Sequence, residues 1–370
     1  SRTGNAHRYQ RCTAGMTTLR ALFLAIAAAT LAAACNTGGD AIREAAVPPV
    51  TIMTFNVENL FDNVDDAGKN DFTFLALEDK QSDEHKALCA PIERDFWRRQ
   101  CLQWDWNDEI IERKLAAIAG AILQVGDGRG ADIIALQEIE NVGILERLRT
   151  QYLADSGYLP AILIEGDDLR GIDVAFLSRL ELHNEPQLHA IDFGDVEPER
   201  ILDTRGILEA TFVLPDGTLL TGYAVHFPAP FHPTRMRESA FDRLNELRDA
   251  LPEDRLAFAA GDFNTTAVED RDKAIFERFV RRHWTVAHDV GCAGCKGTSY
   301  YAPRDDWSFL DTILWSRGKN TTWELRADSV RIASAAPGQT RQNGTPWRFE
   351  IETGAGVSDH WPLVVMIEIE

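Results

Sequence analysis

Eight short apolar segments, each of strand length, constrain the fold of this chain more than any other feature. The predicted strands are Val50–Asn56, Asp132–Glu138, Ile172–Ser178, Ile207–Val213, Leu219–His226, Leu256–Asp262, Ser308–Trp315 and Leu363–Ile369. The turn sequence Pro215-Asp216-Gly217 separates two of them and predicts a hairpin. Many strands, a hairpin and few helices favour an α+β fold with two packed sheets over a doubly wound parallel sheet.

Two helices and one long insertion complete the prediction for the main domain, residues 50–370. Ile111, Leu115, Ile118 and Ile122 recur at helical spacing and predict an amphipathic helix over 108–125. A second helix is expected over 236–250. Residues 62–108 form an ordered insertion that is rich in Asp and Glu and carries Trp97, Trp104, Trp106, Cys89 and Cys101. Two roles fit it equally: a substrate lid, or a cap on the sheet edge.

The first 49 residues have the pattern of a targeting segment rather than of a folded domain. Met16 and a short basic start precede an apolar stretch from Ala21 to Ala34, which is shorter than the roughly 20 residues that span a bilayer. The stretch ends in Leu-Ala-Ala-Ala-Cys35, which resembles a bacterial lipobox. We expect a signal segment at 1–35, lipidation of Cys35 and a tether at 36–49. The expected location is the outer membrane as an anchored lipoprotein, or the periplasm or cell surface. An ordinary signal cut after Ala34 is the alternative.

Four cysteines remain after Cys12 and Cys35 are set aside. Because an exported compartment is oxidising, disulfides are the expected state. Four cysteines allow three pairings, and the simplest joins Cys89 to Cys101 and Cys292 to Cys295. A zinc site built from these thiols is the minority alternative.

The charge of the chain excludes a generic nucleic-acid coat protein. Asp and Glu number 58 against 38 Lys and Arg, which gives a formal net charge of −20. Removal of residues 1–35 takes away four arginines and no acid, and the charge becomes −24. Non-specific binding to nucleic acid is driven by neutralisation of phosphates. The balance therefore favours small phosphorylated substrates or a divalent cation.

Chemically active side chains gather at the ends of the predicted strands. They are Asn56, Glu138, His226, Asp262, Asn264, Asp359 and His360, with Asp311 inside its strand. Each alone is typical of a solvated strand end or a turn. Together they offer oxygen ligands of the kind that Mg²⁺ and Ca²⁺ prefer, and a histidine that a carboxylate can hold. Phosphodiester cleavage needs both.

The motifs around these residues resemble the endonuclease/exonuclease/phosphatase superfamily. The matching segments, in chain order, are Phe55-Asn56-Val57-Glu58-Asn59, Leu136-Gln137-Glu138, Gly171-Ile172-Asp173-Val174-Ala175, Ala224-Val225-His226, Gly261-Asp262-Phe263-Asn264, Phe309-Leu310-Asp311 and Ser358-Asp359-His360. The match covers residues 50–370 and is specific as an ordered set. It implies a DNase-I-like four-layer α/β sandwich. Two packed, mostly antiparallel sheets would be flanked by helices, with the site at one edge.

The resemblance also implies a role for each residue. Glu138 would be the principal metal ligand, with Asn56 and Asp359 completing or tuning that cluster. The expected catalytic residues are His360 paired with Asp311 as base or transition-state stabiliser, Asp262 on the nucleophile or leaving oxygen, Asn264 on the phosphate, and His226 as a donor to a phosphate oxygen.

Two departures from compact members concern substrate access. The 62–108 insertion separates Asn56 from Glu138 by 82 residues. Arg235 and Arg237 follow His226, and they are expected either to meet phosphate or, more simply, to form a solvated helix start. Arg170 has the same two interpretations, and His232 is a candidate neighbour of the site.

The predicted function is divalent-metal-dependent hydrolysis of a phosphoester by activated water. Mg²⁺ is the expected cation, with Ca²⁺ or Mn²⁺ as alternatives. The substrate is left open among nucleic acid, a phospholipid headgroup and a small phosphate ester. The other expected contact is with a membrane through the lipid on Cys35, and no obligate protein partner is inferred. The alternative function is a catalytically silent surface lipoprotein that uses the same scaffold for binding.

Overall fold

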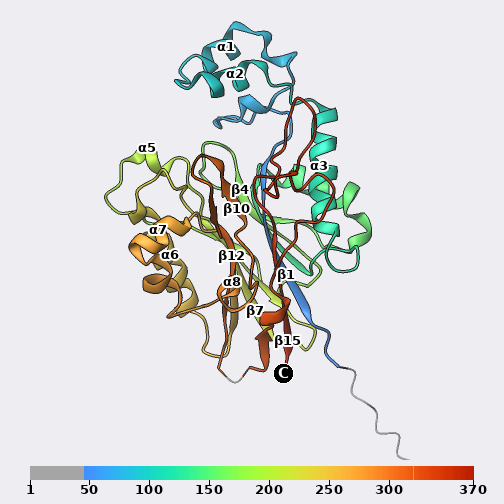
Figure 1. The fold of residues 1–370 in the computed structure, drawn as a ribbon, viewed down its shortest axis with the longest axis vertical. Coiled ribbons are helices and arrows are strands. Elements are labelled where there is room, and N and C mark those ends of the chain that lie inside the picture. Colours follow the sequence, from blue (N-terminus) through green and yellow to red (C-terminus); the bar gives the residue numbers. More distant parts are fainter. Residues whose placement is uncertain (1–45, 320) are drawn as a thin grey trace, which may run out of the picture. The chain divides into compact units, whose positions relative to one another are not determined.

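The computed structural model describes residues 46–319 and 321–370 (Figure 1). The predicted signal segment, the lipobox and residues 36–45 of the tether lie outside the described residues. Within the described part of the chain, no helix combines the length and the apolar character needed to cross a membrane.

The first sheet has seven strands and contains both ends of the main domain. Along the sheet its strands are β13 (Trp323–Leu325), β15 (Leu363–Ile369), β1 (Val50–Leu60), β2 (Ile133–Ile139), β4 (Asp173–Ser178) and β3 (Ile162–Leu163), and β14 (Arg331–Ile332) also pairs with β15. Only β1 and β2 are parallel; the other neighbours are antiparallel.

The second sheet has six strands and repeats this pattern. Its order is β5 (Gln187–His189), β6 (Ile207–Val213), β7 (Leu219–His226), β8 (Leu256–Asp262), β12 (Asp311–Ser316) and β9 (Thr285–Val286). The β6–β7 pair is the hairpin that the Pro-Asp-Gly turn predicted, and β7–β8 is the one parallel pair. A separate two-stranded ribbon joins β10 (Ser299–Tyr301) and β11 (Asp306–Ser308).

Three apolar layers hold the sheets and helices together. Because successive strand residues point to opposite faces, Ile52 joins the core between the two sheets while Met53 faces the outer helix α3 (Asp108–Leu123). On the far side, Phe241 and Leu244 of α6 (Thr234–Asp249) cover the second sheet. The order helix, sheet, sheet, helix confirms the predicted four-layer α+β sandwich.

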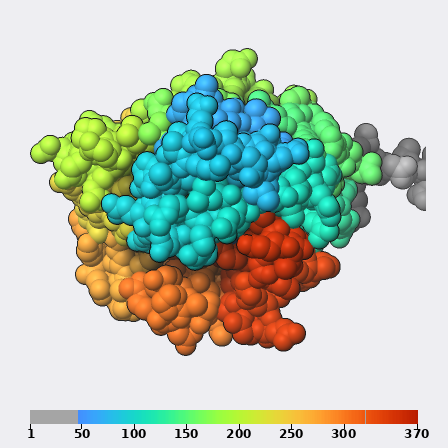
Figure 2. All heavy atoms as spheres, turned by 90° about the horizontal axis from the view of Figure 1, so that it is seen from above, coloured from blue at the N-terminus to red at the C-terminus, as the bar shows by residue number. Residues whose placement is uncertain are grey.

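The remaining helices are short. They are α1 (Asp83–Cys89), α2 (Asp95–Gln103), α4 (Val142–Arg147), α5 (Pro198–Ile201), α7 (Ala267–Lys273) and α8 (Ala287–Val290). The insertion contains α1 and α2, which project beyond the end of the sheets (Figure 1). Seen from that end, the insertion covers the middle of the face, beside the C-terminal loops (Figure 2).

The base of the insertion is packed into the main domain. Trp106 is buried, and its indole nitrogen donates to the carbonyl of Phe61 at 3.1 Å. The Phe74 ring stacks on Phe61 with centroids 3.9 Å apart. By contrast, Phe96 and Trp97 on α2 are exposed. The root of the insertion is therefore anchored at the end of β1, while its outer helix presents aromatic side chains to solvent.

Two predicted features needed correction and one was confirmed. The strand expected over 308–315 is broken at residues 309–310, because Ser308 pairs with β10 in the ribbon whereas Asp311 begins β12. The first strand runs to Leu60 instead of ending at Asn56, because it resumes pairing with β2 after an irregularity. The disulfides are Cys89–Cys101 and Cys292–Cys295, the simplest of the predicted pairings, and they leave no thiols for zinc at these positions.

Candidate active site

Sheet topology brings the predicted residues to one edge. The parallel pairs β1–β2 and β7–β8 each end at the same edge of their sheet. Within the second sheet, His226 and Asp262 are register partners, and Asp311 faces Asp262 from the antiparallel β12. These three predicted side chains therefore lie at strand ends, where a rigid sheet fixes the position of a side chain that faces a loop region.

Backbone irregularities turn the key acid toward this edge. The β1–β2 register shifts between Asn56 and Leu60, and the β2–β4 register shifts around Glu138. Glu138 has φ 65°, Asn59 φ 59° and Asn264 φ 51°. Non-glycine residues in this region are strained, and such strain concentrates at functional sites, as bulges that re-aim side chains also do.

Glu138 is held by β1 rather than by a basic residue. The Asn56 amide nitrogen Nδ2 donates to Glu138 Oε1 at 3.2 Å, and the backbone N–H of Asn59 donates to Oε2 at 3.0 Å. Asn56 Oδ1 accepts from the Glu58 N–H at 3.0 Å, which fixes the orientation of the amide. Asn56 thus differs from the predicted metal ligand: its nitrogen, not its oxygen, faces the carboxylates.

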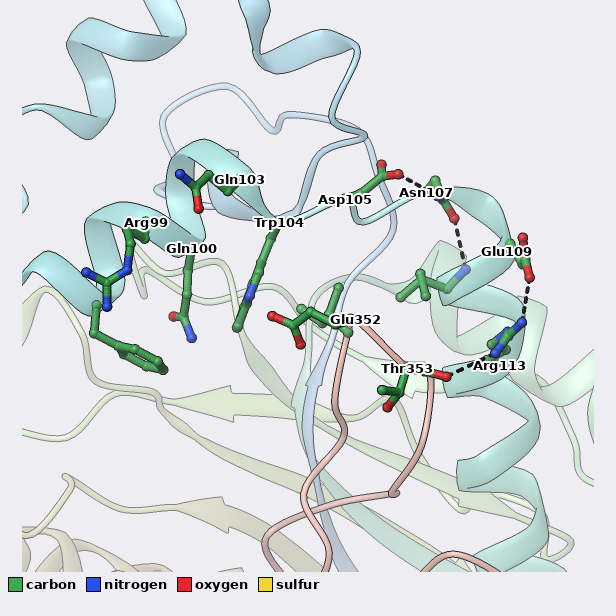
Figure 3. A pocket seen from close by; sticks show the side chains of 13 residues that line it. Arg99, Gln100, Gln103, Trp104, Asp105, Asn107, Glu109, Arg113, Glu352 and Thr353 are labelled. Atoms are coloured by element: carbon green, nitrogen blue, oxygen red, sulfur yellow. Dashed lines mark hydrogen bonds and ion pairs between the residues drawn. The ribbon is translucent and has the colours of Figure 1, made fainter.

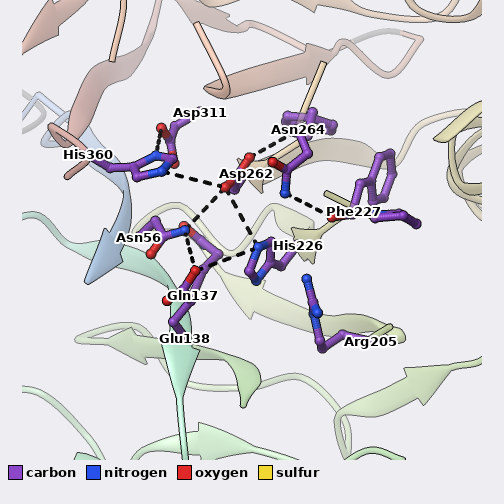
Figure 4. Close-up of polar contacts among 12 residues, drawn as sticks. Asn56, Gln137, Glu138, Arg205, His226, Phe227, Asp262, Asn264, Asp311 and His360 are labelled. Atoms are coloured by element: carbon purple, nitrogen blue, oxygen red, sulfur yellow. Dashed lines mark hydrogen bonds and ion pairs between the residues drawn. The ribbon is translucent and has the colours of Figure 1, made fainter. Parts of the chain in front are cut away.

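Asp262 occupies the centre of the cluster (Figure 4). Its Oδ2 accepts from Asn56 Nδ2 at 3.2 Å and lies 3.7 Å from His226 Nε2 and 4.0 Å from His360 Nε2. Its Oδ1 accepts the backbone N–H of Asn264 at 2.8 Å. Burial, assisted by the nearby Asp311 carboxylate, raises the pKa of Asp262 to about 7. A carboxyl group with such a pKa can both take and give a proton near neutral pH.

His360 and Asp311 form the predicted pair. His360 Nδ1 lies 2.6 Å from Asp311 Oδ2, and both side chains are buried. Burial, the largest single influence, favours the neutral ring, but the charge and hydrogen bond of Asp311, together with the charges of Asp262 and Asp359, raise the pKa of His360 well above its ordinary value. His360 is therefore an imidazolium at neutral pH, with Nε2 directed toward Asp262 (Figure 4).

His226 has the opposite electrostatic character. Burial, together with the charges of Arg205 and Arg170, lowers the pKa of His226 well below its ordinary value. Its Nε2 lies 3.9 Å from Glu138 Oε1, and its Nδ1 has no hydrogen-bond partner. A neutral ring between two carboxylates can donate one hydrogen bond to a bound oxygen, but it adds no charge.

Arg205 is a site residue that the sequence analysis missed. It is buried, its Nη1 donates to Asp168 Oδ2 at 2.9 Å and to the carbonyl of Asp203 at 2.6 Å, and its Nε has no partner. In Figure 4 its guanidinium points toward His226. The sequence signal was an arginine two residues before a predicted strand, and many surface arginines share that position.

Asp359 lies beside His360 and is positioned by Glu58 and Arg348. The Asp359 backbone N–H donates to Glu58 Oε2 at 3.0 Å, and Asp359 Oδ1 lies 3.9 Å from His360 Nε2. Arg348 pairs with Glu58 and lies 3.5 Å from Asp359 Oδ2. Burial, and then the Asp359 charge, raises the pKa of Glu58 to about 7. Lys114 donates to the carbonyls of Val57 and Val357 and so ties the end of β1, which carries Glu58, to the loop that carries Asp359.

The other predicted residues lie either beside the cluster or in the loops that surround it. Asn264 is buried, and its Nδ2 donates to the carbonyl of Phe227 at 2.9 Å, so its position is fixed by the loop after β7. Arg170 is exposed and donates to Asn59 Oδ1 at 3.1 Å, which places it beside Glu138. Arg235 is exposed, as the simpler interpretation expected. His232 Nε2 lies 2.9 Å from Asp203, in the loop that leads to Arg205.

Arg237 fits neither predicted role. It is buried, pairs with Glu269 at 2.5 Å, and donates to the carbonyls of Pro228 and Ala229. Its guanidinium therefore shapes the loop that follows His226 instead of facing solvent or phosphate.

Replacing Arg237 with leucine is expected to lower the free energy of unfolding by about 3–5 kcal/mol, because the Glu269 carboxylate would lose its partner in a partly buried position. Urea unfolding measures the change. Arg235→Leu, at the exposed start of the same helix, should change the free energy by less than about 0.5 kcal/mol. Equal effects of the two substitutions would contradict the buried ion pair.

A separate recess lies at the root of the insertion. It has a volume of 560 Å³ and is lined by residues of α2, α3 and the 351–353 loop, including Gln100, Trp104, Arg113 and Glu352 (Figure 3). None of the predicted catalytic or metal-binding residues lines it. The recess is therefore distinct from the cluster around Asp262.

The oxygen donors at the sheet edge fit a divalent cation of the Mg²⁺ type. Glu138 and Asp359 are carboxylates whose side chains are 15% and 45% exposed. Mg²⁺ in proteins typically takes one or two carboxylates and keeps several waters. Two partly open carboxylates therefore suit such an ion better than a closed cage would.

Comparison with known proteins agrees with this geometry. The sequence model of the Endonuclease/Exonuclease/phosphatase family matches residues 53–360. No curated protein matches the chain. Among solved structures, the chain is similar to an endonuclease/exonuclease/phosphatase from Beutenbergia cavernae, with TM-score 0.53, 15% identity and coverage of 87% of this chain and 72% of that one.

Two further structures share the fold. A family protein from Leptotrichia buccalis has TM-score 0.52, 17% identity and coverage of 87% and 99% of the two chains. A humanized D. rerio TDP2 has TM-score 0.52, 14% identity and coverage of 86% and 99%. At such identities the structures establish the fold alone, whereas the family match spans most of the main domain. The chain belongs to the endonuclease/exonuclease/phosphatase family.

Proposed function

We propose that this protein hydrolyses a phosphoester by attack of water, with a divalent cation held at Glu138 and Asp359. One observation carries the proposal: Glu138, Asp262, His226 and the His360–Asp311 pair converge on one sheet edge, each within 4.0 Å of another member. The family match supports phosphoester hydrolysis as the general reaction class.

The cation would neutralise charge on the phosphate and polarise its oxygen. The residues of the chain accept the proton and stabilise the developing charge. Asp262 accepts a proton from the attacking water, since its pKa of about 7 leaves a useful fraction ionised at neutral pH. His360, held as an imidazolium by Asp311, stabilises the charge that develops on the phosphorus oxygens. The reaction forms a P–O bond to water oxygen and breaks the P–O bond to the leaving group.

His226 and Arg205 complete the phosphate side of the site. Neutral His226 donates one hydrogen bond to a phosphate oxygen, and Arg205 supplies the fixed positive charge beside it. Arg205 is pre-oriented by Asp168, so little side-chain entropy is lost when phosphate binds.

Loss of Arg205 should weaken substrate binding more than the chemical step. The comparison is Asp168→Asn against the double variant Asp168→Asn/Arg205→Met, because the single loss of Arg205 would strand a buried carboxylate. A charge-assisted hydrogen bond contributes about 1.5–3 kcal/mol, which predicts a KM higher by about 10–100-fold in the double variant. Steady-state kinetics measures it, and an unchanged KM would place Arg205 outside the substrate contact.

We also propose that the protein acts outside the cytoplasm, anchored through Cys35. The two disulfides support this, because such bonds persist in oxidising compartments. Globomycin treatment of the expressing bacterium, with mass spectrometry of the N-terminus, tests the anchor: an unlipidated mature chain would refute it.

The test of the proposed function uses soluble protein starting at Asn36 with its disulfides intact. Supercoiled plasmid and bis-p-nitrophenyl phosphate are incubated separately with Mg²⁺, Ca²⁺, Mn²⁺ or EDTA. Metal-dependent nicking of plasmid would assign a nuclease, and turnover of the small diester alone would direct the search to lipid headgroups and small esters. No turnover of either by folded, metal-binding protein would favour the silent binding protein.

A further inference from the structure

A second group of acidic residues lies at the root of the insertion, apart from the residues assigned to catalysis. The loop that follows β1 runs Asp62-Asn63-Val64-Asp65-Asp66-Ala67-Gly68-Lys69-Asn70-Asp71, and Glu140 follows β2. We call the four acids of this loop, together with Glu140, the loop carboxylate cluster: Asp62, Asp65, Asp66, Asp71 and Glu140. The Glu140 N–H donates to the carbonyl of Leu60 at 3.0 Å, so the loop and Glu140 meet where β1 and β2 end.

The distances within this cluster suit one shared cation. Asp66, Asp71 and Glu140 each offer a carboxylate oxygen, and these oxygens all lie within 4.8 Å of one another. Two oxygens that bind the same Ca²⁺ at about 2.4 Å can lie up to about 4.8 Å apart. Asp62 is joined to the group, because Asn141 Nδ2 donates both to Asp62 Oδ2 at 3.1 Å and to Glu140 Oε2 at 3.2 Å.

Two of these carboxylates are buried, and one buried oxygen lacks a donor. Asp71 is 2% exposed and Glu140 3% exposed. Asp71 Oδ2 accepts the backbone N–H of Asp66 at 2.9 Å, but its Oδ1 is inaccessible to water and has no hydrogen-bond partner. Burial, and then the neighbouring Asp65 carboxylate, raise the pKa of Asp71. Buried charges in proteins are paired or coordinate metal ions.

No basic side chain supplies the missing charge. Among residues 46–319 and 321–370, none of the five carboxylates forms an ion pair with lysine, arginine or histidine. Lys69, within the loop, donates instead to the carbonyls of Gly166 and Asp168. Within the described residues, Asp71 Oδ1 therefore remains a buried acceptor with no donor beside it.

We propose that the loop carboxylate cluster binds one Ca²⁺ ion, which fixes the root of the insertion to the ends of β1 and β2. Ca²⁺ takes six to eight oxygen ligands in flexible geometry, whereas Mg²⁺ takes few protein carboxylates. Three carboxylates whose oxygens lie within 4.8 Å of one another, with Asp62 and Asp65 in the same loop, match the first preference. Glu140 is two residues beyond Glu138, so the same ion orders the strand end that carries this proposed ligand of the catalytic cation.

This Ca²⁺ site does not depend on the proposed hydrolase activity, and its test does not use activity. The full soluble chain, stripped with chelator and then saturated with Mg²⁺ to occupy the catalytic edge, is dialysed against ⁴⁵Ca²⁺. Wild-type protein should bind one Ca²⁺ per chain that Mg²⁺ does not displace. At a free Ca²⁺ concentration one hundred times Kd, the melting temperature should rise by about 5 °C.

The variants Asp71→Asn and Glu140→Gln should each abolish the Ca²⁺-dependent rise, and Glu138→Gln should retain it. Because asparagine and glutamine match the two carboxyl side chains in size, both variants should melt in chelator close to the wild-type temperature, so their loss of binding is measured on folded protein. The proposal is overturned if wild-type protein binds no Ca²⁺ in the presence of Mg²⁺. It is equally overturned if Asp71→Asn keeps the rise while Glu138→Gln loses it, since the ion would then lie at the catalytic edge.

Discussion

Replacing His360 with asparagine should lower kcat by about 10²–10³-fold, the range typical for loss of one group that stabilises charge in the transition state. Asparagine keeps a donor for Asp311, which now accepts from His360 Nδ1 at 2.6 Å, but it has no counterpart of Nε2. The substitution therefore removes the group that faces Asp262 and leaves the buried carboxylate partnered. Initial rates at saturating substrate and Mg²⁺ measure the effect.

A half-buried histidine, His288, provides the control. His288 Nδ1 lies 2.7 Å from Thr312 Oγ1, next to Asp311 in the sequence, but His288 has no contact with Asp262. The variant His288→Asn should keep kcat within about threefold of wild type. If both variants lost activity equally, the loss would reflect packing around β12. If neither did, His360 would have no part in the chemical step.

Replacing Glu138 with glutamine should lower kcat/KM by at least about 100-fold and raise the Mg²⁺ concentration needed for half-maximal rate. Removal of a group that merely orients a metal ligand already lowers metal affinity or activity by about 10–100-fold, and Glu138 is proposed to contact the ion itself. Glutamine is isosteric, so the acceptor for the Asn56 and Asn59 donors is partly retained while the charge is lost. Rates across an Mg²⁺ titration give both quantities.

Glu209→Gln is the control for this second prediction. Glu209 is on β6, its side chain is 18% exposed against 15% for Glu138, and it also lies beside a histidine, His189. Its loss should leave the Mg²⁺ dependence of the rate unchanged. A Glu138→Gln enzyme with wild-type Mg²⁺ dependence would show that the cation binds elsewhere.

The apolar segments predicted the strands well because burial on both faces leaves a strong local signal. Met53 and Ile52 face different cores, and both are fully buried, so β1 reads as a continuous apolar run. The prediction failed where a short strand carries no strong apolar pattern. The break before Asp311 exists because Ser308 pairs with a ribbon strand that carries no strong apolar pattern.

The candidate site was located by the motifs, but its internal contacts were not. The bulges that turn Glu138 toward Asn56 arise from register shifts between strands, which local sequence does not encode. Arg205 takes its direction from Asp168, 37 residues away, and Arg237 from Glu269, 32 residues away. Both arginines follow polar loop or helix-start patterns that resemble solvated surface, and only tertiary ion pairing buries them.

The central claim is that water attacks phosphorus in a metal-dependent reaction at the Asp262 cluster. The most direct measurement is hydrolysis of bis-p-nitrophenyl phosphate in ¹⁸O-labelled water with Mg²⁺, followed by mass spectrometry of both products. We expect one labelled oxygen in p-nitrophenyl phosphate, none in p-nitrophenol, and no product with EDTA. Label in p-nitrophenol, or no product from folded protein with Mg²⁺ bound, would contradict the account.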